Sequence, residues 1–224
     1  MYFVAHRGYS ETLEDNSIQA INAAINYNFD MIEVDVQYTS DEHLVLYHNM
    51  YCEKTGKMIY EMDIFESMQN GIVRLEDLFQ LMHLRNAYKT KLYLDLKGNV
   101  KTAELLVTAL RLEGFAENSI YVSSFSYEIA ELLKQASLPI YIGLSTSSSI
   151  PPKIQELLFE TIDFISIDWN VATKSMVQSF KNNGKMVFLF TCHNKREYKH
   201  ILQTIPMSYV EGIITNIVLR KTNI

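Results

Sequence analysis

The sequence predicts a (β/α)8 barrel with a β-hairpin added after the second strand. Eight short runs of apolar, β-branched and aromatic residues recur along the chain, and amphipathic segments separate most of them. Strands that alternate with helices are typical of a parallel sheet, and near-continuous apolar runs are typical of strands covered on both faces. Eight such strands in a chain of 224 residues indicate a closed barrel.

The elements follow in a regular order. After the first run, apolar residues spaced three and four apart predict one helix face (Ile18, Ile21 and Ile25). Later helices are expected at about 76–84, after Ser124, and at 174–183, where Gly184 is a suitable C-cap. The last helix is expected to precede the last strand. The eight predicted strands are 2–5, 31–36, 91–96, 119–123, 139–144, 163–168, 185–191 and 212–215.

One further apolar run, 43–48, does not fit this series. It follows the second strand after residues 39–42 alone, whereas a parallel crossover needs about a dozen residues or more. We therefore expect an antiparallel hairpin. Pairing Tyr38 with Leu44 places His48 opposite Val34, in the neighbourhood of Glu33 and Asp35.

Composition excludes several classes of protein. With 48% hydrophobic and 21% charged residues, the chain is neither disordered nor fibrous. At about 150 residues per domain, its length allows two small domains or one barrel. The four prolines and eight glycines form no linker, so one domain is expected to span residues 1–224. Cys52 and Cys192 are expected to be reduced thiols.

The charge pattern and the N-terminal residues also restrict partners and location. The net charge is −6 without a basic run, which argues against nucleic-acid or anionic-membrane binding. No signal-peptide pattern follows Met1, and the longest strongly apolar run, 186–190, is far shorter than the ~20 residues of a membrane span. We expect a cytoplasmic protein without a membrane anchor. No pattern predicts its oligomeric state.

Carboxylates gather where the predicted strands end, which is where barrels carry their chemistry. Glu33 and Asp35 point to one side of their strand, toward the barrel interior, because apolar residues occupy the other side. Asp95 and Lys97 repeat this spacing on the next strand of the barrel. Three buried carboxylates require positive charge. Arg7 and Lys97 supply part of it, and a divalent cation, Mg²⁺, Ca²⁺ or Mn²⁺ rather than zinc, suits all-oxygen ligands. The alternative is a salt-bridge network without a metal.

Two histidines are expected beside this cluster. His6 and His48 each end an apolar strand and would face the carboxylates. A single histidine on an apolar face is more often a core residue, but two beside three carboxylates favour acid–base catalysis. Of the others, His193 is expected at the rim of the barrel mouth, whereas His83 and His200 are expected on helix surfaces.

These residues belong to motifs in a recognisable order. The chain resembles the glycerophosphodiester phosphodiesterase family over nearly its whole length. The resemblance is most specific as far as His48. The matching elements are His6-Arg7-Gly8, Asp15-Asn16-Ser17, Ile32-Glu33-Val34-Asp35-Val36, Thr39-Ser40-Asp41, His48-Asn49, Asp95-Leu96-Lys97, Ser123-Ser124-Phe125, Phe190-Thr191 and Ile213-Ile214-Thr215-Asn216.

The resemblance implies a (β/α)8 barrel that hydrolyses small glycerophosphodiesters to sn-glycerol 3-phosphate and an alcohol with a divalent metal. It implies that the metal is held by Glu33, Asp35 and Asp95. It further implies that His6 and His48 are general acid and base, and that Arg7 and Lys97 hold phosphate oxygens. A phosphoinositide-type lyase also uses two histidines on a barrel, but the three carboxylates favour the metal-dependent family.

The chain departs from the family pattern at several positions. Asp95 stands where the family usually has Glu, Asn49 and Asn216 replace Asp, and His193 replaces Asn. Residues 14–17 also differ from the usual Pro-Glu-Asn-Thr. Asp15, Asp95 and His193 motivate an alternative, a barrel that binds glycerophosphate ligands without turning them over. Asp95 is one methylene shorter than Glu, so it is expected to weaken the preference for Mg²⁺.

Overall fold

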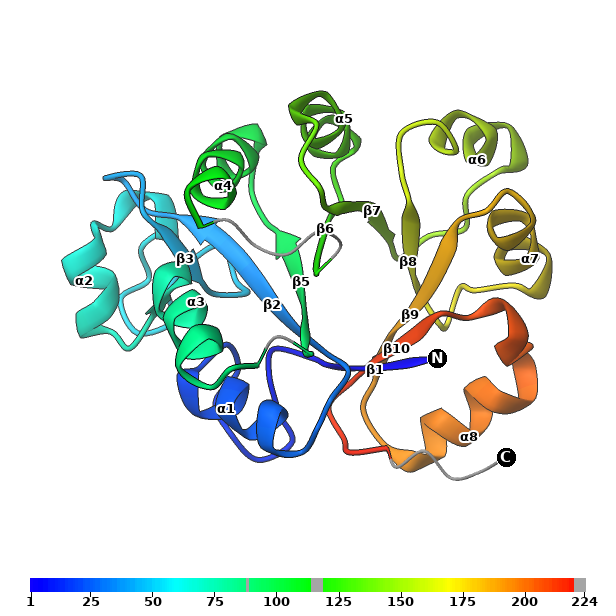
Figure 1. Cartoon of the computed structure of the whole chain (residues 1–224), viewed down its shortest axis with the longest axis horizontal. Helices are drawn as coiled ribbons and strands as arrows, with labels where there is room; N and C mark the ends of the chain where they lie inside the picture. Colours follow the sequence, from blue (N-terminus) through cyan, green and yellow to red (C-terminus); the bar gives the residue numbers. More distant parts are fainter. Residues whose placement is uncertain (88, 114–118, 220–224) are drawn as a thin grey trace.

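The predicted barrel is confirmed. The computed structural model of the chain describes residues 1–87, 89–113 and 119–219. Eight parallel strands form a closed ring, because β1 pairs with both β2 and β10 (Figure 1). In ring order these strands are β1 (Tyr2–Ala5), β2 (Met31–Tyr38), β5 (Lys91–Leu96), β6 (Ile120–Ser124), β7 (Tyr141–Thr146), β8 (Phe164–Asp168), β9 (Met186–Cys192) and β10 (Gly212–Thr215).

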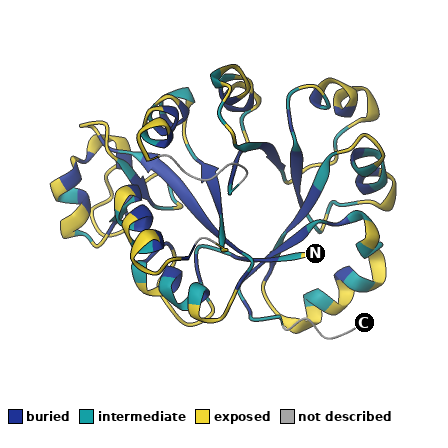
Figure 2. Ribbon diagram, viewed as in Figure 1, coloured by how far each residue is buried: buried dark blue, intermediate teal, exposed yellow. Residues whose placement is uncertain are grey.

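Helices cover the outside of this ring. They are α1 (Ile18–Asn26), α3 (Leu75–Leu84), α4 (Val100–Glu113), α5 (Tyr127–Ala136), α6 (Pro152–Leu158), α7 (Lys174–Asn182) and α8 (Lys195–Thr204). Each turns a buried side toward the strands and an exposed side outward (Figure 2). Gly184 follows α7 with φ of +73°, which confirms its predicted role as the helix end.

The bounds of β1, β5 and β10 are the predicted ones, and those of the other barrel strands differ from the predicted bounds by one or two residues. The largest change at a strand start is in β7, which begins at Tyr141 instead of residue 139. Pro139 has no backbone N–H to donate to a neighbouring strand, and the N–H of Ile140 bonds to the carbonyl of Leu138 at 2.8 Å. The chain therefore turns before it joins the sheet.

The barrel interior has an apolar layer beneath a polar one. Side chains from seven strands fill the apolar layer, and aromatic rings meet edge-on there, as between Tyr93 and Phe164 at 5.5 Å between ring centroids. The seven buried members are Val4, Met31, Tyr93, Tyr121, Phe164, Phe188 and Ile214. On β2, Val34 and Val36 belong instead to the layer between strands and helices. The predicted alternation is therefore confirmed, and Glu33 and Asp35 lie inside the barrel above Met31.

The hairpin after β2 is also confirmed, with the predicted register. Strand β3 (Leu44–Leu46) runs antiparallel to β2, with Tyr38 opposite Leu44 and Val36 opposite Leu46. The N–H of Tyr47 continues the ladder to the carbonyl of Asp35 at 3.1 Å. The chain therefore brings His48 beside the middle of β2, where it lines one cavity with Glu33 and Asp35.

The segment after His48 forms an extension that the sequence analysis did not describe. A 3-10 turn (Ile59–Glu61), helix α2 (Ile64–Gln69) and strand β4 (Val73–Arg74) follow, and β4 pairs with β3. The extension projects from one side of the barrel (Figure 1). It has its own small core, made of Val45, Cys52, Ile59, Met62, Ile64 and Ile72.

Two smaller predictions can also be compared with the structure. Cys52 and Cys192 are both free and buried, as expected. Across residues 1–87, 89–113 and 119–219, no helix combines the length and the apolar character that crossing a bilayer requires.

Candidate active site

All seven residues selected from the sequence line one cavity. It has a volume of about 260 Å³, and His6, Arg7, Glu33, Asp35, His48, Asp95 and Lys97 all contribute to its wall. They lie on β2 and β5 or in the segments that follow β1, β3 and β5. Two aromatic rings, Phe125 and Phe190, form an apolar part of the same wall. A larger groove of about 1090 Å³ lies beside α8 and the turn after α1, but it includes none of the seven residues.

The loop after β1 curls over the end of β2. Arg7 and Gly8 both have positive φ values, 56° and 79°, and this turns the N–H of Arg7 toward the Glu33 carboxylate at 2.8 Å. A Cβ atom at position 8 would lie 2.7 Å from the carbonyl carbon of Ala20. Only glycine therefore permits both the turn and the close packing of α1 beneath it.

Three carboxylates converge in the cavity. Glu33, Asp35 and Asp95 are 3%, 1% and 7% exposed, and each offers an oxygen within 4.8 Å of the others. Hydroxyl donation from Ser123 at 2.8 Å orients the Asp95 carboxylate. Buried carboxylate oxygens at this spacing are suitable ligands for a hard divalent cation. The donor set therefore fits the metal that the sequence analysis expected.

The charges within the cluster are unevenly compensated. Lys97 forms ion pairs with Asp35 at 2.9 Å and with Asp95, and Arg7 Nε lies 3.2 Å from Asp35. Burial opposes ionisation of Asp35, but Lys97 and Arg7 lower its pKa below the ordinary value. Burial, with repulsion from Asp35 and Asp95, raises the pKa of Glu33 well above the ordinary value. Three carboxylates thus face two cations, and Glu33 is the carboxylate whose ionisation is opposed.

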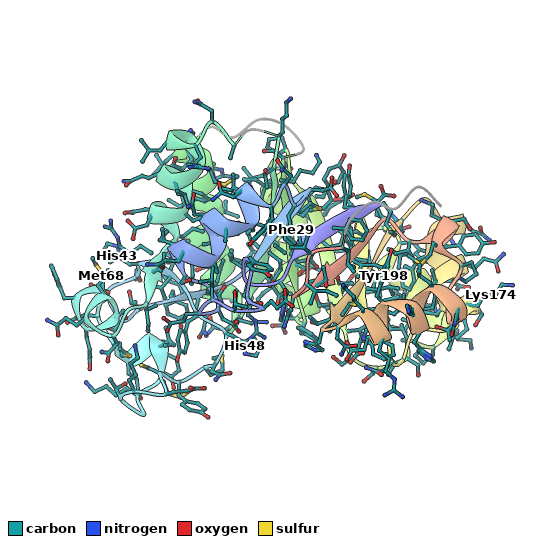
Figure 3. All side chains as sticks on the ribbon, turned by 90° about the horizontal axis from the view of Figure 1, so that it is seen from below. Phe29, His43, His48, Met68, Lys174 and Tyr198 are labelled. Carbon is teal, nitrogen blue, oxygen red and sulfur yellow. The ribbon has the colours of Figure 1, made fainter. Side chains whose placement is uncertain are left out.

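The two histidines approach the cluster from different strands. His6 bonds through Nδ1 to Asn216 at 2.7 Å, and burial together with the Arg7 charge lowers the pKa of His6 to about 3. His48 bonds through Nδ1 to Asn49 at 2.9 Å, and Asn49 donates to Glu53 at 2.7 Å. In Figure 3, His48 lies where the extension meets the barrel, away from Lys174 and Tyr198. In both imidazoles Nδ1 is engaged, which leaves Nε2 for the cavity.

The structure adds residues that were not selected as site residues. Asn16 donates to the Asp35 carboxylate at 2.9 Å and accepts the backbone N–H of Asp35 at 3.0 Å. Asp15 pairs with Arg7 at 2.7 Å, so it holds the guanidinium from the solvent side. Both stand in a quoted motif, Asp15-Asn16-Ser17, and that motif was the available signal. Arg7 and Lys97 line the cavity, but each is engaged by carboxylates in this structure.

Comparisons with known proteins show which family and which solved structures this chain is similar to. The profile of the Glycerophosphoryl diester phosphodiesterase family matches residues 6–219. A glycerophosphodiester phosphodiesterase of Caldanaerobacter subterraneus subsp. tengcongensis is 25% identical, over 95% of this chain and 93% of that protein. Among solved structures, an Oleispira antarctica phosphodiesterase in complex with the product sn-glycerol-3-phosphate has a TM-score of 0.80 at 21% identity, covering 96% of this chain and 93% of that one. A glycerophosphodiester phosphodiesterase of Parabacteroides distasonis has a TM-score of 0.81 at 20% identity, covering 96% and 92%.

Proposed function

Because the chain is an enzyme of the glycerophosphoryl diester phosphodiesterase family, we propose that it hydrolyses small glycerophosphodiesters to sn-glycerol 3-phosphate and an alcohol. The observation that carries this proposal is the meeting of two histidines, three carboxylates and two cations in one cavity. At about 260 Å³ the cavity suits a small polar diester.

Cleavage of a phosphodiester requires stabilisation of the negative charge that builds up on its non-bridging oxygens. Arg7 and Lys97 are the cations in the cavity wall, and a planar guanidinium can bond two phosphate oxygens at once. On substrate binding, Arg7 would give up part of its ion pair with Asp15, and Lys97 part of its ion pair with Asp95, to contact the phosphate. We assign both of them to phosphate binding.

Glu33, Asp35 and Asp95 would hold the divalent cation, for which we propose Mg²⁺, Ca²⁺ or Mn²⁺. When bound, such an ion supplies positive charge to the phosphoryl oxygens and offsets the repulsion between the carboxylates. Asn16 keeps Asp35 oriented toward the cavity through its two hydrogen bonds. Ser123 does the same for Asp95.

The reaction also moves two protons. One leaves the attacking oxygen, and one reaches the alkoxide of the departing alcohol. His6 and His48 divide these transfers, each through Nε2, since Nδ1 of each ring is hydrogen-bonded to an asparagine. Each transfer is typically worth about 10²–10⁴-fold in rate.

The test is release of sn-glycerol 3-phosphate from glycerophosphocholine and from diesters with other head groups, with each of the three cations added. We expect His6→Ala and His48→Ala each to lower kcat by at least ~10²-fold. The matched control is His43→Ala, because His43 is exposed at the start of the hairpin strand. Its turnover should equal that of the wild type.

The wild type must release product for the proposal to stand. Binding of sn-glycerol 3-phosphate without turnover of any diester would favour a ligand-binding barrel instead. Near-normal turnover in either histidine variant, with an unchanged cooperative melt, would remove that histidine from the proton transfers. A lower melting temperature with modest loss of activity would give it a structural role.

A further inference from the structure

A chain of hydrogen bonds leads from His6 to a second histidine at the barrel mouth. Asn216 Oδ1 lies 2.7 Å from His6 Nδ1, and Asn216 Nδ2 lies 3.2 Å from His193 Nδ1. The two imidazole rings face each other edge-on, with centroids 6.5 Å apart and planes at 80°. Asn216 therefore bridges two imidazoles through the two ends of one amide.

The backbone holds these three residues in fixed places. The N–H of His6 bonds to the carbonyl of Thr215 at 3.0 Å, and the N–H of Asn216 bonds to the carbonyl of Cys192 at 3.1 Å. The N–H of His193 donates to the Glu197 carboxylate at 2.6 Å, at the start of α8. Adjacent strand ends of β1, β10 and β9 thus present the three side chains to one another.

The amide has one donor end and one acceptor end, so its orientation fixes where the imidazole protons lie. With Oδ1 toward His6, the Nδ1 of His6 must carry a proton. With Nδ2 toward His193, the Nδ1 of His193 must be unprotonated. This arrangement satisfies all four atoms without a charge on either ring.

We infer that Asn216 is a positioning residue for His6 and that His193 sets the direction of its amide. Held in this way, His6 keeps its proton on Nδ1 and exchanges protons with substrate through Nε2. The amide also fixes the plane of the imidazole ring. Because the amide is neutral, it does so without forming the carboxylate–imidazolium pair that an aspartate would form. This inference rests on the proposed function of His6.

The surroundings of His6 are consistent with a neutral ring. Burial lowers the pKa of His6 most, the charges of Arg7 and His193 lower it further, and Asp35 acts in the opposite direction. An aspartate at position 216 would add a negative charge at 2.7 Å from Nδ1, where the structure has a neutral oxygen. The amide therefore provides the orientation of a carboxylate partner without its effect on basicity.

The direct test is the ¹⁵N NMR spectrum of the two imidazoles in the intact wild-type protein at neutral pH. We expect His6 with a protonated Nδ1 and a bare Nε2, and His193 with a bare Nδ1. A His6 ring protonated on Nε2 alone would reverse the amide and overturn the inference.

Three variants test the functional consequence. Asn216→Ala should lower kcat by at least about tenfold with little change in KM, and its His6 ring should show mixed tautomers. Asn216→Asp retains an acceptor for Nδ1–H, so it should recover most of kcat while moving the pH profile of His6 upward. His193→Ala should mix the His6 tautomers with a smaller loss of kcat. Asn183→Asp, at the exposed end of α7, is the control for an added charge and should leave the profile unchanged.

Failure of this inference can be told apart from failure of the proposed function. An active wild type, an inactive His6→Ala and a fully active Asn216→Ala with an unaltered His6 tautomer would overturn the positioning role alone. A wild type without phosphodiesterase activity would end the proposed function, and the NMR spectrum would still decide which nitrogen of His6 is protonated.

Discussion

Removal of the divalent cation should lower the melting temperature of this protein, and Asp95→Asn should abolish most of that effect. In the absence of a cation, three buried carboxylates face only Arg7 and Lys97. A cation that binds only the folded chain stabilises it by about 2.7 kcal/mol when its concentration is 100 times Kd. For a chain of this length, that corresponds to a rise of about 5–11 °C in melting temperature.

Asp95→Asn removes one negative charge without removing the oxygen that accepts from Ser123. Lys97 keeps its ion pair with Asp35, so the fold should persist. At an effective dielectric constant of ~20, unit charges ~4 Å apart interact by about 4 kcal/mol, so Kd should rise at least ~100-fold. At the same cation concentration the stabilisation then falls to about 0.4 kcal/mol, or about 1–2 °C.

The assay is thermal melting after exhaustive chelation, followed by titration with Mg²⁺, Ca²⁺ and Mn²⁺, with calorimetry to measure Kd. Asp168→Asn is the matched control, because Asp168 also ends a barrel strand but is absent from the cavity wall. It should respond to cations as the wild type does. If chelation changes neither the melting temperature nor the activity of the wild type, the metal site is refuted and a salt-bridge network is favoured. Equal shifts of the melting temperature in wild type and Asp95→Asn would show that Asp95 is not a metal ligand.

Asp95→Glu should keep activity and tighten Mg²⁺ binding.

Three other perturbations follow from the same geometry. Arg7→Lys keeps the positive charge but loses the planar guanidinium, so kcat/KM for glycerophosphocholine should fall by about tenfold or more. Unchanged kinetics in this variant would make Arg7 only an ion-pair partner of Asp15 and Asp35. Gly8→Ala places a Cβ atom 2.7 Å from a backbone atom of Ala20 at a φ of +79°, so chemical denaturation should show that the free energy of unfolding falls by at least ~2 kcal/mol. An unchanged denaturation midpoint would contradict the packing argument. The raised pKa of Glu33 stabilises the chelated fold fully below its unfolded pKa of about 4.3, and this contribution is lost as pH rises through the folded pKa. The free energy of unfolding of chelated wild type should therefore fall relative to Glu33→Gln as the pH rises above about 4.3, and parallel curves would show that Glu33 ionises normally.

Much of the barrel and most of the site could be predicted from the sequence, because the signals are local. The alternation on β2 decides which residues face the interior, so Glu33 and Asp35 could be separated from Val34 and Val36 without any tertiary information. The hairpin register followed from a connection too short for a crossover. These patterns depend on the geometry of one strand or one turn.

The extension after His48 could not be predicted in the same way. Its core joins Val45 to Ile59 and Ile72 across turns and a helix of only six residues. No sustained periodicity marks so short an element, and its apolar residues have meaning only once β4 pairs with β3.

Several partners of the site residues were decided by tertiary structure. His6 and Asn216 are 210 positions apart and meet only because β1 pairs with β10 to close the ring. Likewise, Ser123 reaches Asp95 through the pairing of β6 with β5. The sequence determined which side chains line the cavity, since residue type and strand position are local properties. Closure of the barrel determined which groups orient them, since a hydrogen bond of 2.7 Å depends on the placement of strands at opposite ends of the chain.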